Sequence, residues 1–273
     1  MSEIRRVLVH WHTAKPESVE AAPDVIDRLR RAGFEVLEPN SGDPDVLILL
    51  GGDGFLMESL RHFAYPRYPV FGINFGTVGF LMNSHSCIPS LTDILREGRS
   101  LAVSHPLLEA VAHQEDGKTA RVYAFNEFVL ERQTGQAVRL EIEVNRRLFN
   151  RFAGDGFVIS TPAGSTAYNL AAGGPAVHPA VQGIVLTPLY PHQAEPFHSV
   201  QFSLVLPLES EISVSAEELL KRHVRLVADG HAFPHIARVT IRDSGRRVTL
   251  LRTPDREFTR LLSEKFIGAR DGA

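Results

Sequence analysis

One stretch of the sequence, "DVLILLGGDGFLMESL", restricts the folds open to this chain more than any other. An apolar run follows Asp45 and stops at Gly51–Gly54, and the pattern of an amphipathic helix begins at Phe55. A continuous apolar run is typical of a strand buried on both faces of a parallel sheet, with helices covering the faces. The stretch therefore predicts an α/β fold with Gly51–Gly54 at the carboxyl end of a central strand.

The pattern of apolar residues changes at about residue 100. Before that point, short apolar strands alternate with helical segments such as residues 24–32, which Gly33 follows as a helix-ending residue. After it, strands such as "VRLEIEV" alternate apolar with charged residues, which is typical of half-buried strands. The chain therefore divides into an α/β domain over residues 1–100 and a β-rich domain over residues 101–252.

The last segment, residues 253–273, contains the amphipathic pattern "PDREFTRLLSEKFIGA". Phe258, Leu261, Leu262 and Phe266 share one face of the helix that this pattern predicts. Because that apolar face needs a partner, we expect the C-terminal helix to dock on the first domain.

Net charge, the length of apolar runs and the cysteine count limit the partners and the cellular location expected for this chain. The formal net charge of −3 gives no basic footprint for nucleic acid or an anionic membrane, and we expect neither as a partner. We find no apolar run long enough to span a bilayer. Cys87 is the only cysteine, so no intramolecular disulfide can form, and a cytoplasmic location is expected.

The glycines around Asp53 suggest chemistry with phosphate. Glycines at a strand end let backbone N–H groups approach phosphate oxygens, and the N-terminus of the following helix favours negative charge. The Asp53 carboxylate would repel phosphate, so it fits orienting or deprotonating a hydroxyl, or helping to hold a metal ion. An ordinary helix cap is the alternative interpretation.

Two further stretches are rich in small residues. "GINFGTVGFLMN" lacks G-x-G-x-x-G spacing, so it is not the usual dinucleotide fingerprint. "GDGFVISTPAGSTAYNLAAGGPAVHP" runs from a strand into a loop, Thr161–Thr166, and then a short helix. Hydroxyls and free amides at a helix start suit phosphate or ribose, and a Ser/Thr-rich turn is the alternative.

Other candidate motifs are weaker. "DGKT" at Asp116–Thr119 resembles the end of a P-loop, but Ala112 stands where the first glycine is required. "AGSTA" around Ser165 does not have the G-x-S-x-G pattern of a hydrolase.

The histidines do not form a recognisable ligand set in the sequence. His10 and His12 alternate on a predicted strand, and His231 and His235 flank Pro234. Neither pair is accompanied by a second ligand pair, so no metal-ligating residues are predicted.

The motifs "GGDG", "GINFGTVGFL", Asn126-Glu127 and "GDGFVISTPAGSTAYNLAAGGPAVHP", in this order, resemble those of the NAD kinase family. Diacylglycerol and sphingosine kinases and phosphofructokinases have stretches similar to "GGDG", whereas "STPAGSTAY" is much more specific. The resemblance implies a Rossmann-like N-terminal domain and a β-sandwich-like C-terminal domain, with the active site between them. It also implies transfer of a phosphoryl group from ATP or polyphosphate to the 2′-hydroxyl of the adenosine ribose of NAD, giving NADP.

The resemblance carries site residues over to this chain. Asp53 is the implied catalytic residue. The residues that the resemblance implies to line the site or contact the dinucleotide are Asp53, Gly54, Phe80, Asn126, Glu127, Asp155, Thr166, Ala167, Tyr168, Asn169, Leu170, Ala171, Tyr190 and His231. A divalent cation, Mg²⁺, and a homo-oligomer (dimer or tetramer) are also implied.

One departure from the family pattern lies beside Asp53. The family usually has threonine after G-G-D-G, and Phe55 stands there in this chain. Phenylalanine cannot offer a hydroxyl to the phosphoryl donor, and we expect its ring to pack against Ser59 or an apolar wall. Two alternative functions are a lipid kinase of the related G-G-D-G group and a non-catalytic NAD(P)-binding regulator, which Phe55 favours.

Overall fold

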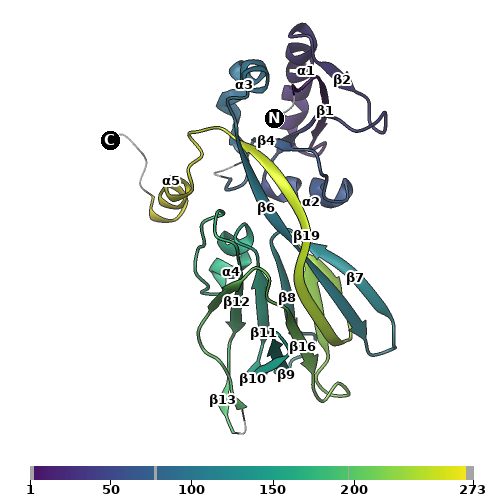
Figure 1. Ribbon diagram of the computed structural model, residues 1–273, viewed down its shortest axis with the longest axis vertical. Helices are drawn as coiled ribbons and strands as arrows, with labels where there is room; N and C mark the ends of the chain where they lie inside the picture. The colour runs from purple at the N-terminus through teal and green to yellow at the C-terminus, as the bar shows by residue number, and fades with distance from the viewer. Residues whose placement is uncertain (1–2, 77–78, 196, 269–273) are drawn as a thin grey trace. The chain divides into compact units, whose positions relative to one another are not determined.

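The computed structural model describes residues 3–76, 79–195 and 197–268 (Figure 1). The chain divides into two compact units, called unit 1 (residues 1–104 and 248–273) and unit 2 (residues 105–247). Thr77 and Val78, in the second glycine-rich stretch, lie outside the described residues. Within the described residues, no helix is long and apolar enough to cross a membrane.

Unit 1 is built on a parallel sheet in the strand order β19–β4–β3–β1–β2, with β5 paired to β4. Every residue of β3 is buried, as its continuous apolar sequence predicts for a central parallel strand. The elements are β1 (Arg6–Trp11), α1 (Pro16–Arg31), β2 (Glu35–Leu37), β3 (Val46–Gly51), α2 (Asp53–His62), β4 (Val70–Asn74), β5 (Asn83–Ser84), η1 (His85–Ser90), α3 (Leu91–Glu97) and the end of β19 (Ile236–Arg252).

Helix α1 begins earlier than the sequence pattern predicted. The predicted helix covered residues 24–32, whereas α1 starts at Pro16 and its buried stripe continues back to Ser18 and Ala22. Proline is favoured in the first turn because its missing N–H has no helical partner there. The prediction missed these turns because their buried residues are small or polar.

Unit 2 consists of two antiparallel sheets whose inner faces form one core. One sheet has the order β15–β12–β11–β8–β17–β18, and the other contains β10–β9–β16–β19 and the pair β6–β7. The core draws Phe128 and Phe157 from the first sheet and Phe152 and Ile241 from the second, and the rings of Phe152 and Phe157 meet edge to face at 4.4 Å. The fold class predicted from the sequence, α/β followed by a β-sandwich-like domain, is confirmed.

The strands of unit 2 differ in length, and the two edge strands of the six-stranded sheet, β15 and β18, are shorter than the strands between them. They are β6 (Leu101–Gln114), β7 (Thr119–Ala124), β8 (Glu127–Arg132), β9 (Val138–Val144), β10 (Arg147–Gly154), β11 (Gly156–Ser160), β12 (Gly183–Leu189), β13 (Gln193–Ala194), β14 (Phe197–His198), β15 (Leu204–Pro207), β16 (Ile212–Ala216), β17 (Val224–Ala228), β18 (His231–Phe233) and the first part of β19; η2 (Gly164–Thr166) and α4 (Tyr168–Ala171) follow β11.

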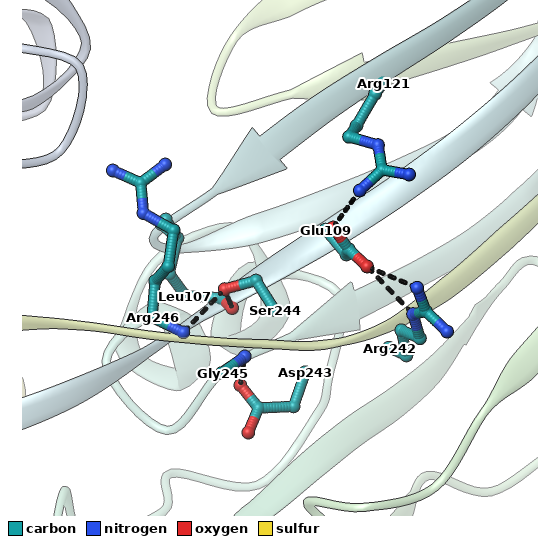
Figure 2. Close-up of polar contacts among 8 residues, drawn as sticks. All are labelled: Leu107, Glu109, Arg121, Arg242, Asp243, Ser244, Gly245 and Arg246. Carbon is teal, nitrogen blue, oxygen red and sulfur yellow. Dashed lines mark hydrogen bonds and ion pairs between the residues drawn. The ribbon is translucent and has the colours of Figure 1, made fainter.

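A buried carboxylate links three strands of unit 2. Glu109 of β6 accepts from Arg121 of β7 at 3.3 Å and from two nitrogens of Arg242 of β19 at 2.8 Å (Figure 2). Beside it, the hydroxyl of Ser244 donates to the carbonyl of Leu107 at 2.6 Å. Two guanidinium partners offset the cost of burying this carboxylate, so the cluster holds β6, β7 and β19 together.

The C-terminal helix belongs to unit 1, as predicted. It comprises α5 (Phe258–Leu262) and a π-helical turn, η3 (Ser263–Ile267). Leu261 is buried, and the ring of Phe258 lies 6.3 Å from that of Phe80. Phe266 is half exposed, so the apolar face predicted for this helix is only partly covered.

Candidate active site

In unit 1, the first turn of α2 brings the two glycine-rich stretches together. Gly52 is the extended residue before the helix, and Asp53 is its first residue. The Asp53 carboxylate accepts the backbone N–H of Phe80 at 2.6 Å and of Leu81 at 3.2 Å. Asp53 therefore anchors the loop after β4 as well as standing at the helix N-terminus.

Three glycines lie where the two stretches meet. Two of them, Gly51 and Gly79, are approached too closely by side chains to carry a Cβ, and the third, Gly54, borders open space. A Cβ at Gly79 would lie 2.8 Å from the Asp53 carboxylate, and one at Gly51 would lie 2.4 Å from the Phe55 ring. A Cβ at Gly54 would meet nothing within 4 Å, so the space beside the first turn of α2 is open. The N–H groups of that turn have no helical acceptor and can bind an anion there.

Two arginines that the sequence analysis did not single out lie at this loop. Arg252, at the end of β19, is buried, and burial together with Arg256 lowers its pKa to about 10, although Asp53 and Asp255 act in the opposite direction. Arg256 donates to the carbonyl of Gly79 at 2.5 Å. Within the described residues, the Nε–H groups of Arg252 and Arg256 have no hydrogen-bond partner. Because buried cations are costly unless paired, these groups are suited to an anionic ligand.

The ring of Phe55 packs inside unit 1. It is buried, with its centroid 5.1 Å from the rings of both His10 and His12. The ring therefore packs against two imidazoles and Gly51, where we expected Ser59 or an apolar wall. Burial, followed by the neighbouring His62, lowers the pKa of His10, so His10 packs on Phe55 as a neutral ring.

The loop can hold Mg²⁺ only together with a ligand. Asp53 supplies one carboxylate, and within the described residues it does not belong to a set of three close metal-ligating side chains. Mg²⁺ commonly binds one or two carboxylates plus substrate phosphates and water. The donor set at Asp53 therefore fits a cation that enters with phosphates and does not fit a site made by protein atoms alone.

In unit 2, the chain changes sheets between β7 and β8. Strand β7 ends at Ala124, and β8 begins at Glu127 in the other sheet. The N–H groups at the crossing are therefore bonded by a side chain. Asp229, in the β17–β18 turn, accepts from Phe125 at 2.7 Å, Asn126 at 2.9 Å and Glu127 at 3.2 Å.

The "STPAGSTAY" loop lies directly against this crossing. The hydroxyl of Thr161 donates to the carbonyl of Phe125 at 2.7 Å, and its N–H donates to the carbonyl of Asn126 at 2.9 Å. A Cβ at Gly164 would lie 2.2 Å from the same Asn126 carbonyl, so only glycine fits there. Two motifs that are 38 residues apart, counted from Asn126 to Gly164, thus form one surface.

Glu127 is the most perturbed acid of this surface. Burial, assisted by the Asp229 carboxylate, raises its pKa to about 8, while a hydrogen bond from the backbone N–H of Tyr168 acts in the opposite direction. Within the described part of the chain, Glu127 Oε2 and Asn126 Oδ1 are buried without a hydrogen-bond partner. Both atoms can therefore accept hydrogen bonds from a ligand.

The predicted dinucleotide-contacting tract follows as η2 and α4, where Asn169 is buried and has a structural role. Its amide donates to the carbonyls of Ser165 at 2.9 Å and Pro175 at 3.0 Å, and its oxygen accepts from Thr187 at 2.7 Å. The Asn169 side chain is thus engaged in shaping the loop. The other predicted residues of the tract lie in sequence along it: Thr166 at the end of η2, Ala167 before α4, and Tyr168, Leu170 and Ala171 within α4.

A pocket of about 260 Å³ in unit 2 contains Asp155, Tyr168 and Tyr190, all predicted site residues. Asp155 pairs with Arg132 at 3.1 Å. Tyr190 is mostly exposed and has a backbone φ of 44°, a left-handed conformation that is unusual for a residue with a side chain. The structure therefore brings these three residues together.

His231, the last predicted residue, is exposed at the start of β18. It pairs with Ala228 across the β17–β18 hairpin, two residues after Asp229. Asp229 itself was missed from the sequence, although the turn signal "ADG" marks its position. Its role depends on the distant N–H groups at residues 125–127, which no local pattern reveals.

Comparison with known proteins identifies the family. A family model described as the ATP-NAD kinase C-terminal domain matches residues 125–253. An NAD kinase of Xanthomonas campestris pv. campestris is 36% identical over 228 residues, which are 82% of this chain and 86% of the relative. The chain belongs to the NAD kinase family. A Brucella suis NAD kinase is 32% identical over 253 residues, 92% of this chain and 93% of the relative.

Solved structures agree with the fold expected of the NAD kinase family. Yeast NADH kinase complexed with NADH superposes with a TM-score of 0.84 at 21% identity, covering 100% of this chain and 90% of the other. An NAD kinase from Archaeoglobus fulgidus in complex with ATP gives a TM-score of 0.75 at 24% identity, covering 95% and 98%. The resemblance stated from the sequence motifs is thus confirmed.

Proposed function

We propose that this protein is an NAD kinase that transfers a phosphoryl group from ATP or polyphosphate to the 2′-hydroxyl of the adenosine ribose of NAD, giving NADP. Besides membership of the NAD kinase family, one observation supports the proposal. Asp53 is a fixed carboxylate in a loop that is otherwise cationic and rich in N–H donors. A carboxylate in such a place serves a hydroxyl better than it serves phosphate. The related lipid-kinase alternative is not favoured by the family match.

Asp53 is the proposed catalytic residue. Two backbone N–H donors, from Phe80 and Leu81, fix the orientation of its carboxylate. A carboxylate so held accepts a hydrogen bond from the ribose hydroxyl and aligns its oxygen for attack on the terminal phosphorus. The proton passes to Asp53 as the new P–O bond forms and the bond to the leaving phosphate breaks.

The phosphoryl donor is proposed to lie at the N-terminus of α2. The N–H groups of its first turn, together with the buried Arg252 and the partly buried Arg256, would neutralise the donor phosphates. Mg²⁺, when bound with the donor at Asp53, would supply further charge neutralisation. Phosphoryl transfer depends mainly on such positioning and charge stabilisation.

The residues of unit 2 are proposed to bind NAD. Asn126 and Glu127 have unpartnered oxygens that can accept from ribose hydroxyls or from the nicotinamide carboxamide. A Glu127 with a pKa of about 8 is mostly protonated at neutral pH and can also donate one hydrogen bond. Asp155, Tyr168 and Tyr190 form the neighbouring pocket for another part of the dinucleotide.

The ligands named for the two solved structures, NADH for the yeast enzyme and ATP for the archaeal one, support NAD and ATP as the substrates of this chain. We also propose the predicted domain division at residues 1–100, 101–252 and 253–273. A cytoplasmic location is proposed because Cys87 is the single cysteine.

A homo-oligomer is proposed as well. Unit 2 exposes the large apolar side chains of Leu148, Phe149, Phe202 and Val205. Phe149 and Phe202 line one surface pocket, and exposed apolar patches are common at subunit interfaces. A second copy of the chain is therefore the expected partner, as a dimer or tetramer.

A coupled assay of NADP formation tests the proposed activity. The wild-type protein is expected to form NADP from NAD with ATP or polyphosphate. Asp53→Asn should lower turnover by roughly a hundredfold or more while NAD still binds, the scale expected of an acid–base or orienting group. Asp43→Asn, at an exposed position outside the loop, is the control. A wild-type protein that binds NAD but forms no NADP with either donor would support the regulator alternative.

A further inference from the structure

One cluster of metal-ligating side chains lies outside the candidate active site. Among residues 3–76, 79–195 and 197–268, Glu115, His223 and His235 each bring one ligand atom within 4.8 Å of the others. Glu115 follows β6, His223 precedes β17 and His235 lies between β18 and β19. All three residues belong to unit 2, and none of them is among the residues proposed to bind NAD or the phosphoryl donor.

The three segments are held together by their backbones. The N–H of Glu115 donates to the carbonyl of His235 at 2.8 Å, and the N–H of Gln133 donates to the carbonyl of His223 at 2.9 Å. The side chain of Gln133 also accepts the N–H of His235 at 3.2 Å. His235 is held with a backbone φ of 55°, in the left-handed region. The ligand atoms are therefore positioned by the fold before any ion binds.

The separations of the ligand atoms match the edges of a zinc tetrahedron. Glu115 Oε1 lies 3.1 Å from His223 Nδ1 and 3.9 Å from His235 Nδ1. The two Nδ1 atoms are 3.4 Å apart, and the imidazole rings meet edge to face at 4.9 Å. Zinc–ligand bonds of about 2.0–2.1 Å place tetrahedral ligands about 3.3 Å from one another.

A hydrogen bond uses only part of this arrangement. One proton on His223 Nδ1 can serve Glu115, but the Nδ1 atom of His235, 3.4 Å from His223 Nδ1, is then left without a proton of its own to share. A second proton on His235 Nδ1 would place two N–H groups against each other. A divalent cation at the common centre would accept a lone pair from each of the three atoms.

We propose that Glu115, His223 and His235 form a binding site for Zn²⁺. Two imidazole nitrogens and one carboxylate oxygen are a recognised zinc donor set and disfavour Mg²⁺, which prefers oxygen ligands. The side chains are 23%, 30% and 48% exposed, so water can supply the fourth ligand. The ion would join the β6–β7 turn to both ends of the β17–β18 hairpin, the hairpin whose turn carries Asp229.

The test is a titration of untagged, chelator-treated full-length protein with Zn²⁺ against a chromophoric chelator. We expect one equivalent bound, and Co²⁺ in its place should give the absorption of a tetrahedral site. His223→Ala/His235→Ala should lose at least about tenfold in affinity for Zn²⁺. Substituting residues that only orient metal ligands already lowers metal affinity by about that factor. His192→Ala/His198→Ala removes two exposed histidines elsewhere in unit 2 and should bind as the wild type does.

A thermal melt separates lost binding from lost folding. Zn²⁺ should raise the melting temperature of the wild type and of the control, because an ion that binds only the folded state stabilises it. It should leave that of His223→Ala/His235→Ala unchanged, and Glu115→Gln should respond less than the wild type. Equal zinc affinity in all four proteins, or no binding by the wild type in excess Zn²⁺, would overturn the proposal.

Discussion

Two loops of this protein use a carboxylate in the same way and differ in what surrounds it. In unit 1, Asp53 accepts the backbone N–H groups of Phe80 and Leu81. In unit 2, Asp229 accepts those of residues 125–127. In both loops the carboxylate satisfies N–H groups where regular hydrogen bonding stops, so each acts as an anchor for a glycine-rich or irregular segment.

The neighbours of the two anchors have opposite charge. Beside Asp53 lie Arg252 and Arg256, with unpartnered Nε–H donors within the described residues. Beside Asp229 lies a second acid, Glu127, with an unpartnered acceptor. The first loop thus offers hydrogen-bond donors with positive charge, and the second offers acceptors. This contrast teaches that the anchoring carboxylate is common to both loops, and we propose that its neighbours select phosphate in one loop and sugar or nicotinamide in the other.

Among the variants that test this contrast, the largest expected effect concerns the cationic loop. Arg252→Met should raise the Michaelis constant for ATP by about tenfold to a hundredfold, the worth of one charged hydrogen bond. Without ligands its melting temperature should not fall, because a buried guanidinium without a full set of partners costs stability. Steady-state kinetics and thermal melts check both results, with the exposed Arg260→Met as the control. A larger change in the constant for NAD would contradict the assignment of this loop to the donor.

The acidic loop should have its own pH dependence. The pKa of Glu127 is raised to about 8 from its ordinary 4.5, so between these values the folded protein binds more protons than the unfolded chain. Glu127 therefore contributes stability at low pH that is lost as the pH rises from about 4.5 through 8. Glu127→Gln should flatten this fall in the free energy of unfolding. Urea unfolding at several pH values measures it, and parallel profiles for the two proteins would show that folding does not raise the pKa of Glu127.

Asn126→Ala tests the same loop with a neutral side chain. Its unpartnered Oδ1 should bond to NAD, so the variant should raise the Michaelis constant for NAD by up to about tenfold. The constant for ATP, measured on the same protein, should change less and serves as the internal control. The opposite ranking would mean that this side chain faces the phosphoryl donor.

The smallest expected effect on substrate binding is that of Phe55→Thr. A hydroxyl in the first turn of α2 should lower the Michaelis constant for ATP by a few-fold, about one net hydrogen bond. The substitution also removes the phenyl ring that packs on His10 and His12, which should lower the free energy of unfolding by about 3 kcal/mol. Kinetics and urea unfolding separate the two effects. An unchanged constant for ATP would show that only the N–H groups of this turn contact the donor.

The sequence by itself determined the order of the main elements. It also pointed to some of the residues of the two candidate loops, the one around Asp53 and the one around Glu127. A continuous apolar run followed by glycines specifies a buried parallel strand and a helix N-terminus, because local burial and backbone freedom decide both. Alternating residues after Leu101 specify antiparallel strands for a similar local reason. Asp53 could therefore be singled out from its glycine-rich stretch, whereas Asn126 and Glu127 were implied only by the resemblance to the NAD kinase family.

Only the tertiary structure decided which distant groups meet these motifs. Strand β7 gives way to β8 at Phe125 because the chain crosses to another sheet, and sequence periodicity does not mark such a crossing. Asp229 bonds to N–H groups about a hundred residues earlier, and Arg252 reaches the Asp53 loop from the far end of the chain. Electrostatics and hydrogen bonding act through space between whole segments, so partner choice, the raised pKa of Glu127 and the Glu115 cluster all depend on the completed fold.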